Sequence, residues 1–85
     1  MKRYTILFAK QAKRDVALLS PKLRKKLQTI LQDVIAMDPY VGKRLSGDLA
    51  GCYSYRLSYQ DHIVYEIHEY KVTVFILRVR THYGD

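Results

Sequence analysis

The chain has 85 residues, enough for one small domain with a modest hydrophobic core. Its formal net charge of +7 and its pI of about 9.7 favour a polyanionic partner, either nucleic acid or an acidic protein; the alternative is a basic surface that only keeps the chain in solution. The single cysteine, Cys52, excludes an internal disulfide and a cysteine-built zinc site, and it fits a reducing compartment. No apolar run approaches the roughly 20 residues of a membrane span, so we expect a cytoplasmic protein.

The N-terminal region alternates in hydrophobicity and then changes to a helical pattern. Tyr4, Ile6 and Phe8 fall on one side of an expected strand over residues 2–8, because side chains in a strand alternate between its two faces. From residue 9 to residue 19 the apolar positions recur instead with the spacing of a helix. The polar face of this first helix carries Lys10, Lys13 and Arg14.

A second helix is predicted from Pro21 to about Met37. Ser20 is a favoured N-cap residue, and proline is well tolerated at the first helical position. A broad apolar stripe runs along this helix, which ends at Asp38-Pro39. The first turn is basic, which opposes the helix dipole, so the charge serves either a solvated surface or contact with phosphate. That turn carries Lys22, Arg24, Lys25 and Lys26.

The C-terminal half is predicted to be a loop followed by three strands. Gly42 and Gly47 interrupt the loop over residues 40–50, which also contains Lys43 and Arg44. Short connections separate strands at about residues 52–58, 62–68 and 71–80, which favours an antiparallel meander. The expected fold is α+β in the order β-α-α-β-β-β, with a helical hairpin packed on one face of a small, mostly antiparallel sheet. Residues 1–85 are expected to form a single domain.

Alternation along these three strands predicts one apolar face and one basic face. The apolar face, expected under the helices, comprises Tyr53, Tyr55, Leu57, Ile63, Tyr65, Ile67, Phe75, Leu77 and Val79. The basic face comprises Arg56, His62, Arg78, Arg80 and His82, together with Val74 and Ile76. The assignment assumes regular alternation, since one β-bulge reverses the faces of the residues that follow it.

A face that carries arginines and histidines suits the cleavage of RNA by its own 2′-hydroxyl. Arginine binds two phosphate oxygens at once and stabilises the charge that develops on phosphate during the reaction. Histidine, with an unperturbed pKa of about 6.5, can transfer protons to and from oxygen. The acidic residues do not cluster in the sequence, so it implies neither a metal site nor a cofactor. Arg56 is the first candidate for a functional role, because an arginine in the middle of a strand needs a reason to be there.

Two sequence patterns resemble those of the RelE/ParE superfamily of bacterial and archaeal toxin–antitoxin systems. The first is L-x-G-x-L-x-G-x-Y-x-x-R, from Leu45 to Arg56, followed by IVYEI at residues 63–67. The second is the ending RVRTHY, which is similar to the RelE and YoeB branches. The likeness covers nearly the whole chain and implies a RelE-like fold. It also implies a messenger-RNA endoribonuclease that acts in the ribosomal A site and is held inactive by an acidic antitoxin.

The resemblance further implies roles for individual residues. Arg56 matches a catalytic basic residue of the first meander strand, and His62 stands where the family usually has an arginine. His82 and Tyr83 match the closing His-Tyr pair of YoeB-like members, in which this pair is catalytic. We therefore expect Arg56 to hold the scissile phosphate, His82 to act as acid or base, and His62 to assist, while Tyr83 positions the RNA. Further phosphate contacts are expected from Lys43, Arg44, Arg78 and Arg80.

The expected partners follow from the charge and from the resemblance. They are an acidic antitoxin of the RelB type or a similar one, mRNA on the ribosome, and ribosomal RNA; the toxin–antitoxin complex can also bind operator DNA. Docking on the ribosome is expected from Lys10, Lys13, Arg14, Lys22, Arg24, Lys25 and Lys26. Two alternatives stay open. One is a ParE-like inhibitor of DNA gyrase, and the other is a basic module that binds an antitoxin or nucleic acid without catalysis.

Overall fold

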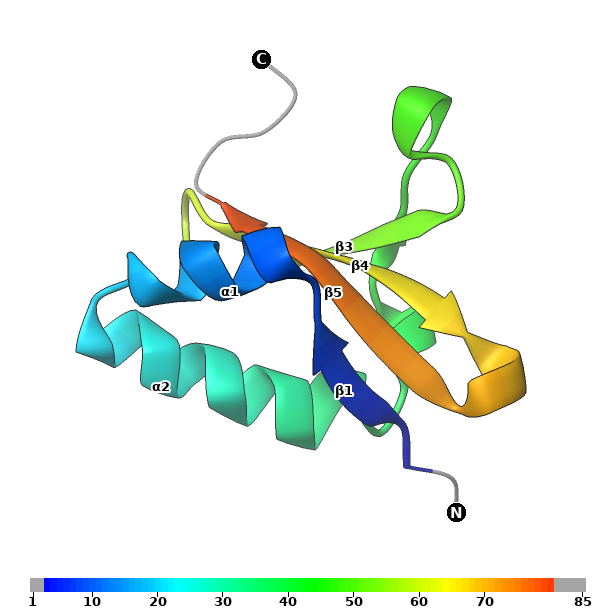
Figure 1. Cartoon of the computed structure of the whole chain (residues 1–85), viewed down its shortest axis with the longest axis horizontal. Helices are drawn as coiled ribbons and strands as arrows, with labels where there is room; N and C mark the ends of the chain where they lie inside the picture. Colours follow the sequence, from blue (N-terminus) through cyan, green and yellow to red (C-terminus); the bar gives the residue numbers. More distant parts are fainter. Residues whose placement is uncertain (1–2, 81–85) are drawn as a thin grey trace.

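Two helices cover one face of a five-stranded sheet in the computed structural model, which describes residues 3–80 (Figure 1). The elements in chain order are β1 (Thr5–Phe8), α1 (Lys10–Ala17), α2 (Pro21–Ile30), a π-helical turn (Leu31–Ile35), β2 (Lys43–Arg44), β3 (Cys52–Arg56), β4 (His62–His68) and β5 (Thr73–Arg80). The strand order is β1-β5-β4-β3-β2, in which β1 is parallel to β5 and all other neighbours are antiparallel. The predicted α+β fold, with a helical hairpin on a mostly antiparallel sheet, is confirmed.

The helical hairpin begins and ends largely where the sequence signals indicate. The hydroxyl of Ser20 accepts a hydrogen bond from the amide of Leu23 at 3.2 Å and so caps α2, with Pro21 at its first position. The last turn widens, because the amide of Ala36 donates to the carbonyl of Leu31 at 2.8 Å. The predicted second helix is therefore one continuous segment to Ile35, with a π-helical end in place of an α-helical one.

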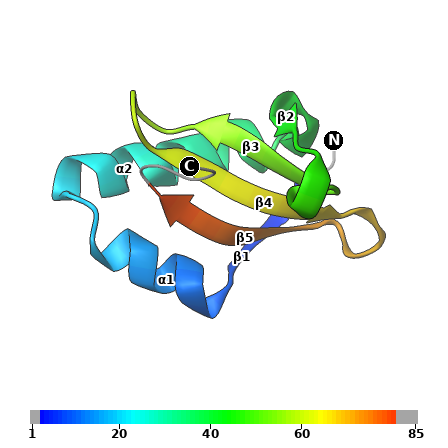
Figure 2. The ribbon, with the colours of Figure 1, turned by 90° about the horizontal axis from the view of Figure 1, so that it is seen from above.

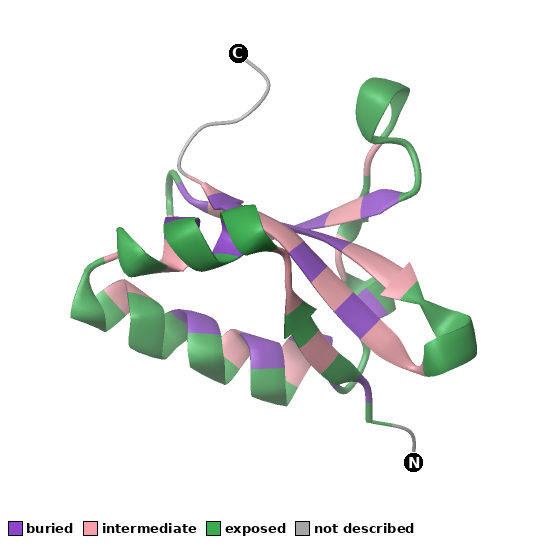
Figure 3. Ribbon diagram, viewed as in Figure 1, coloured by how far each residue is buried: buried purple, intermediate pink, exposed green. Residues whose placement is uncertain are grey.

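The core lies between the hairpin and the sheet. Figure 3 shows the buried positions of the helices turned towards the strands, with exposed positions on the outer side. The central residues are at most 5% exposed and come from both layers: Ala12, Leu27, Leu31, Ile35, Ile63, Tyr65, Val74, Ile76 and Val79. Viewed from above in Figure 2, β3, β4 and β5 lie side by side as a twisted layer. The helices lie on one face of this layer, and on the opposite face Cys52, Ser54 and Val64 are also buried.

The register between β4 and β5 contains a β-bulge. Val64 pairs with Arg78, whereas the next residue, Tyr65, pairs with Ile76, so the pairing skips Leu77. An extra residue in one strand reverses its alternation beyond that point. The two halves of β5 therefore present opposite sets of residues to the core.

This bulge corrects the predicted faces of the first half of β5. Val74 and Ile76 lie under the helices with 0% exposure, whereas Phe75 pairs with Glu66 on the opposite face. The predictions that Phe75 faces the core, and that Val74 and Ile76 share the face of Arg78, are wrong. The physical reason is the extra residue, since regular alternation was assumed throughout the strand.

The predicted loop over residues 40–50 also contains a short strand. Lys43 and Arg44 form β2, which pairs with Ser54 and Tyr53 of β3 at the edge of the sheet. A strand of two residues is too short to show alternation, so the sequence carries no sign of it. The sheet thus has one more strand than predicted.

Candidate functional site

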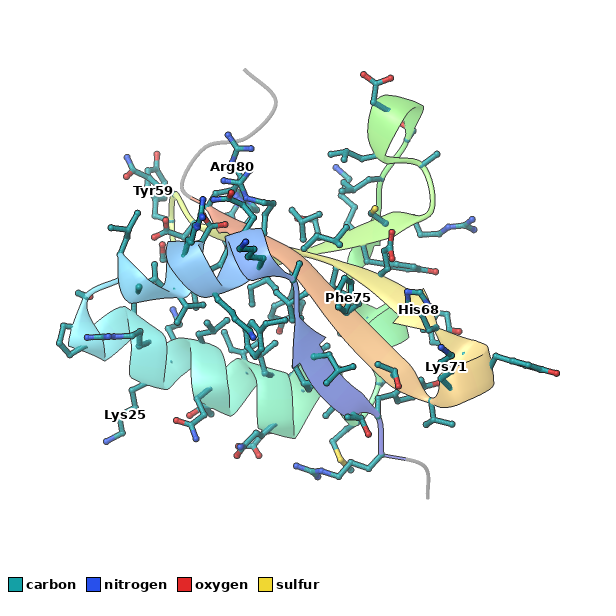
Figure 4. All side chains as sticks on the ribbon, in the orientation of Figure 1. Lys25, Tyr59, His68, Lys71, Phe75 and Arg80 are labelled. Atoms are coloured by element: carbon teal, nitrogen blue, oxygen red, sulfur yellow. The ribbon has the colours of Figure 1, made fainter. Side chains whose placement is uncertain are left out.

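Three basic or titratable side chains lie in one row across the sheet, on the face opposite the helices. Arg56 of β3 pairs with His62 of β4, and His62 pairs with Arg80 of β5. Paired residues on neighbouring strands project from the same face and lie about 4.5–5.5 Å apart. Arg56 is exposed, while His62 and Arg80 are half-buried. The register confirms that these three residues share a face, as predicted. Arg56, His62 and Arg80 form the basic row, of which Arg80 is labelled in Figure 4.

Arg78 lies on the same face by register, but its side chain forms an ion pair with Asp15. Its Nε donates to Oδ2 of Asp15 at 2.8 Å, and its Nη2 donates to Oδ1 at 3.3 Å. Burial acts to raise the pKa of the Asp15 carboxyl, but hydrogen bonds from Arg78 and from the Val79 amide outweigh it and hold that pKa below its usual value. The same hydrogen bond raises the pKa of Arg78. Arg78 therefore joins α1 to β5.

The two basic residues of β2 are separated by the pleat of the strand. Lys43 pairs with Ser54, which lies two residues before Arg56 on the face of the basic row. Arg44 pairs with Tyr53 and points to the other face. Both side chains are exposed. The structure thus brings Lys43 to the face of the basic row and takes Arg44 away from it.

The turn between β3 and β4 fixes one end of the basic row. The carbonyl of Asp61 accepts the amides of Leu57 and Ser58 at 2.8 and 3.1 Å. The hydroxyl of Ser58 donates to Oδ2 of Asp61 at 2.7 Å, and the side chain of Asp61 is buried. Serine and aspartate commonly close turns in this way. This turn sets Arg56 directly opposite His62, which is the first pair after it.

The basic residues predicted for docking lie elsewhere on the molecule. All of them are exposed residues of α1 or α2, on the side of the sheet that the basic row does not occupy: Lys10, Lys13, Arg14, Lys22, Arg24, Lys25 and Lys26. Figure 4 shows Lys25 projecting outward from α2, far from Arg80. The predicted docking residues and the basic row thus lie on different elements, the helices and the sheet.

The tyrosines of β3 and β4 belong to the core or pack against it, whereas Tyr40 lies outside the sheet and is 50% exposed. Tyr65 is fully buried, donates to the carbonyl of Pro39 at 2.7 Å, and stacks on Tyr53 with ring centres 5.9 Å apart. Burial raises the pKa of Tyr65. Tyr40 donates to Glu69 at 2.7 Å, and this hydrogen bond raises the pKa of Tyr40 to about 12. Tyr40 and Tyr65 therefore stay protonated at neutral pH.

His82 and Tyr83, the remaining predicted catalytic residues, lie outside the described residues. Between residues 3 and 80, no three histidine, cysteine or acidic side chains are grouped closely enough to hold a metal ion. Within the same range, no helix has the length and apolar character needed to span a bilayer. The structural roles of Asp15 and Asp61 have only weak signals in the sequence. Asp15 is one of several charged residues on a helix, and Asp61 belongs to a Ser-x-x-Asp turn.

The helical hairpin on a small sheet is a fold shared with solved toxins of bacterial toxin–antitoxin systems. The fold superimposes on the toxin–antitoxin complex RelBE2 from Mycobacterium tuberculosis with a TM-score of 0.88 and 32% identity, covering 99% of this chain and 97% of that chain. It superimposes on the YoeB–YefM complex from Staphylococcus aureus with a TM-score of 0.78 and 25% identity, covering 95% of this chain and 99% of that chain. For the intact RelBE complex of E. coli the TM-score is 0.77 at 26% identity, and the match covers 96% of this chain and 99% of that chain.

The sequence places the chain within this class. The profile of the ParE-like toxins of type II bacterial toxin–antitoxin systems matches residues 6–84. The chain belongs to this family and has the RelE/YoeB fold. Curated protein sequences give no significant match.

Proposed function

We propose that this toxin is an endoribonuclease that cleaves mRNA in the ribosomal A site. The observation that supports this most directly is the basic row, in which Arg56, His62 and Arg80 come from three adjacent strands and face away from the helices. A single phosphodiester placed over β4 would lie within reach of all three side chains. Such convergence on one phosphate is what in-line attack by a 2′-hydroxyl requires.

Each residue of the site has a chemical task in this proposal. Arg56 holds the scissile phosphate, since its exposed guanidinium can bind two oxygens, and Arg80 supports it from the other side of His62. His62 assists with proton transfer. His82 is the acid or base, and Tyr83 positions the RNA, as the resemblance to YoeB-like members implies. The 2′-hydroxyl of the substrate is the nucleophile, so the reaction needs no cofactor.

The remaining basic residues suit binding to RNA and to an acidic partner. Lys43 can contact a neighbouring phosphate from the edge strand, and the helices can dock on ribosomal RNA through theirs. An acidic antitoxin would compete for these surfaces, and the pair could bind operator DNA. Ribosome-bound mRNA places the activity in the cytoplasm.

Mapping of mRNA 5′ ends tests the proposal. Wild-type toxin and the His82→Ala variant are each added to translating ribosomes, and new 5′ ends are located relative to the A site. We expect cleavage by the wild type and none by the variant, because proton transfer contributes about 10²–10⁴-fold to such reactions. Unchanged cleavage by His82→Ala would exclude the assigned role of His82.

A ParE-like inhibitor of DNA gyrase is the second candidate, because the matching family profile is that of the ParE-like toxins. The basic row favours the ribonuclease, since gyrase inhibition needs no group that transfers protons. A supercoiling assay with the purified chain separates the two. Inhibition of supercoiling without any cleavage of ribosome-bound mRNA would favour the gyrase inhibitor.

A further inference from the structure

The basic row places two arginines, Arg56 and Arg80, on the strands on either side of His62. Both guanidinium groups are permanently charged and repel each other, so the backbone must hold them in place. Arg56 is held through the turn that Asp61 closes, and His62 lies on the central strand of its row. Arg80 is the last residue of β5, on the outer side of this row. The inner edge of β5 pairs with β4 up to Arg80, so any further support for Arg80 comes from the outer edge of β5.

That outer edge loses its partner strand before Arg80 is reached. β1 accompanies β5 only from Thr73 to Ile76, and the last bond in this direction is from the amide of Ala9 to the carbonyl of Ile76 at 2.8 Å. Among residues 3–80, β4 continues beside the inner edge of β5 up to Arg80, but no strand continues along its outer edge beyond Ile76. The chain turns instead into α1, which lies against β5 (Figure 1).

Asp15 of α1 takes the place of the missing strand. Its Oδ2 accepts the amide of Val79 at 2.9 Å, as a backbone carbonyl of a neighbouring strand would. The same carboxylate binds Arg78 through two hydrogen bonds and is only 8% exposed. Asp15, Val79 and Arg80 also line one small cavity of about 200 Å³ together with two leucines of the interhelical turn.

We propose that Asp15 is a positioning residue for cleavage: it fixes the end of β5 and thereby sets Arg80 beside His62. This inference depends on the proposed ribonuclease function. Arg78 supplies the positive charge that keeps the buried Asp15 ionised, and it leaves Arg80 as the arginine that β5 contributes to the basic row. Asp15 itself touches neither the RNA nor the reacting atoms.

The test is a graded series of variants in the full chain. Asp15→Asn keeps an oxygen for the Val79 amide but loses the charge that binds Arg78, and Asp15→Ala loses both. Asp33→Ala is the matched control, since it removes an exposed carboxylate from the same helical hairpin. Cleavage is measured on ribosome-bound mRNA at a temperature where thermal unfolding shows every variant folded, and exchange of the Val79 amide is measured by NMR.

We expect kcat to fall by about 10- to 100-fold in Asp15→Ala, with KM almost unchanged, because small displacements of catalytic groups cost this much. Asp15→Asn should be intermediate, and the protection of the Val79 amide should follow the same order. The Asp33→Ala control should match the wild type in both measurements. A wild-type kcat in Asp15→Ala, or a reduced kcat without faster exchange at Val79, would overturn the inference.

Failure of the proposed function gives a different pattern. A wild type that cleaves no mRNA refutes the ribonuclease, and the exchange series then decides by itself whether Asp15 holds the end of β5. Unchanged protection of Val79 in Asp15→Ala refutes the positioning role whatever the reaction is.

Discussion

At the scale of single residues, the site depends on side chains of two kinds. Arg56 and His62 lie in regular strands, so alternation was enough to predict that they share a face. Asp15 could not be predicted in this way, because helical spacing indicates the face on which a residue lies but not its partner. That partner, Arg78, is 63 residues away in the chain. Only the packing of α1 on β5 brings the two together.

A close approach between two residues gives the first stability prediction. A Cβ atom at Gly42 would collide with the hydroxyl of Tyr65 and would lie 3.0 Å from the carbonyl oxygen of Ser54. Because Tyr65 is fully buried and bonded to Pro39, its hydroxyl has no free space to enter. We expect Gly42→Ala to lower the free energy of unfolding by about 1–3 kcal/mol, measured by urea denaturation.

The Gly42→Ala/Tyr65→Phe double variant is the control for this prediction. Without the hydroxyl, the alanine has one fewer atom to displace, so the combined cost should be smaller than the sum of the two single costs. Simple additivity would show that the collision with Tyr65 is not the cause.

At the scale of elements, the sequence predicts the long regular ones and misses the irregular ones. The helical hairpin, β1, β3 and β4 follow from periodicity, apart from up to three residues at their ends. The bulge at Leu77 is hidden because residues 74–77, VFIL, are all apolar, so a change of face leaves no mark in the pattern. β2 is too short to have a pattern, and Gly42 beside it suggested a loop. Half of β5 was therefore assigned to the wrong face.

The junction of α1 with β5 leads to a prediction of acid sensitivity. The pKa of Asp15 is lower in the folded state than in the unfolded state, where it is about 3.9. Its ionised form therefore stabilises the fold fully above that unfolded-state value, and this contribution disappears as the pH falls through the lower folded-state pKa. We expect Asp15→Asn to lower the melting temperature at pH 7 and to approach the wild type below about pH 4.

Thermal unfolding of both proteins across this pH range is the measurement. The Asp33→Asn variant should show no such convergence, because Asp33 is exposed on the surface of the helical hairpin. A difference between wild type and Asp15→Asn that stays constant down to the lowest pH would contradict the assignment of the lowered pKa to this ion pair.

At the scale of the whole molecule, the net charge of +7 is divided between two sides. The helices carry exposed lysines and arginines, among them Lys25, which projects outward from α2 far from Arg80 (Figure 4). By the strand register, the basic row faces away from the helices. A toxin that docks by its helices would keep the basic row open to a second RNA strand. Binding to the ribosome and cleavage of mRNA should therefore be separable by mutation.

Charge reversal on α2 tests this separation. We expect Lys25→Glu to weaken association with ribosomes and to reduce the dependence of log K on log salt by about 0.7–0.9 for each phosphate that the toxin no longer neutralises. Cleavage at saturating toxin should stay unchanged. Lys71→Glu on the β4–β5 turn, which makes the same change of charge, is the control. Equal weakening by the two variants would show that overall charge, and not the helical surface, governs docking.

The skipped pairing at Leu77 has a consequence for the numbering of β5 itself. In an uninterrupted strand, all even-numbered residues would share one face. Here Val74 and Ile76 enter the core, whereas Arg78 and Arg80, also even-numbered, lie on the opposite face. Because of the one inserted residue, even-numbered residues face the core before Leu77 and face away from it after Leu77. A related chain without this inserted residue would need its cations at odd-numbered positions of this strand to present them on the same face. An alignment of the two chains without a gap would therefore match the arginines of one with core residues of the other.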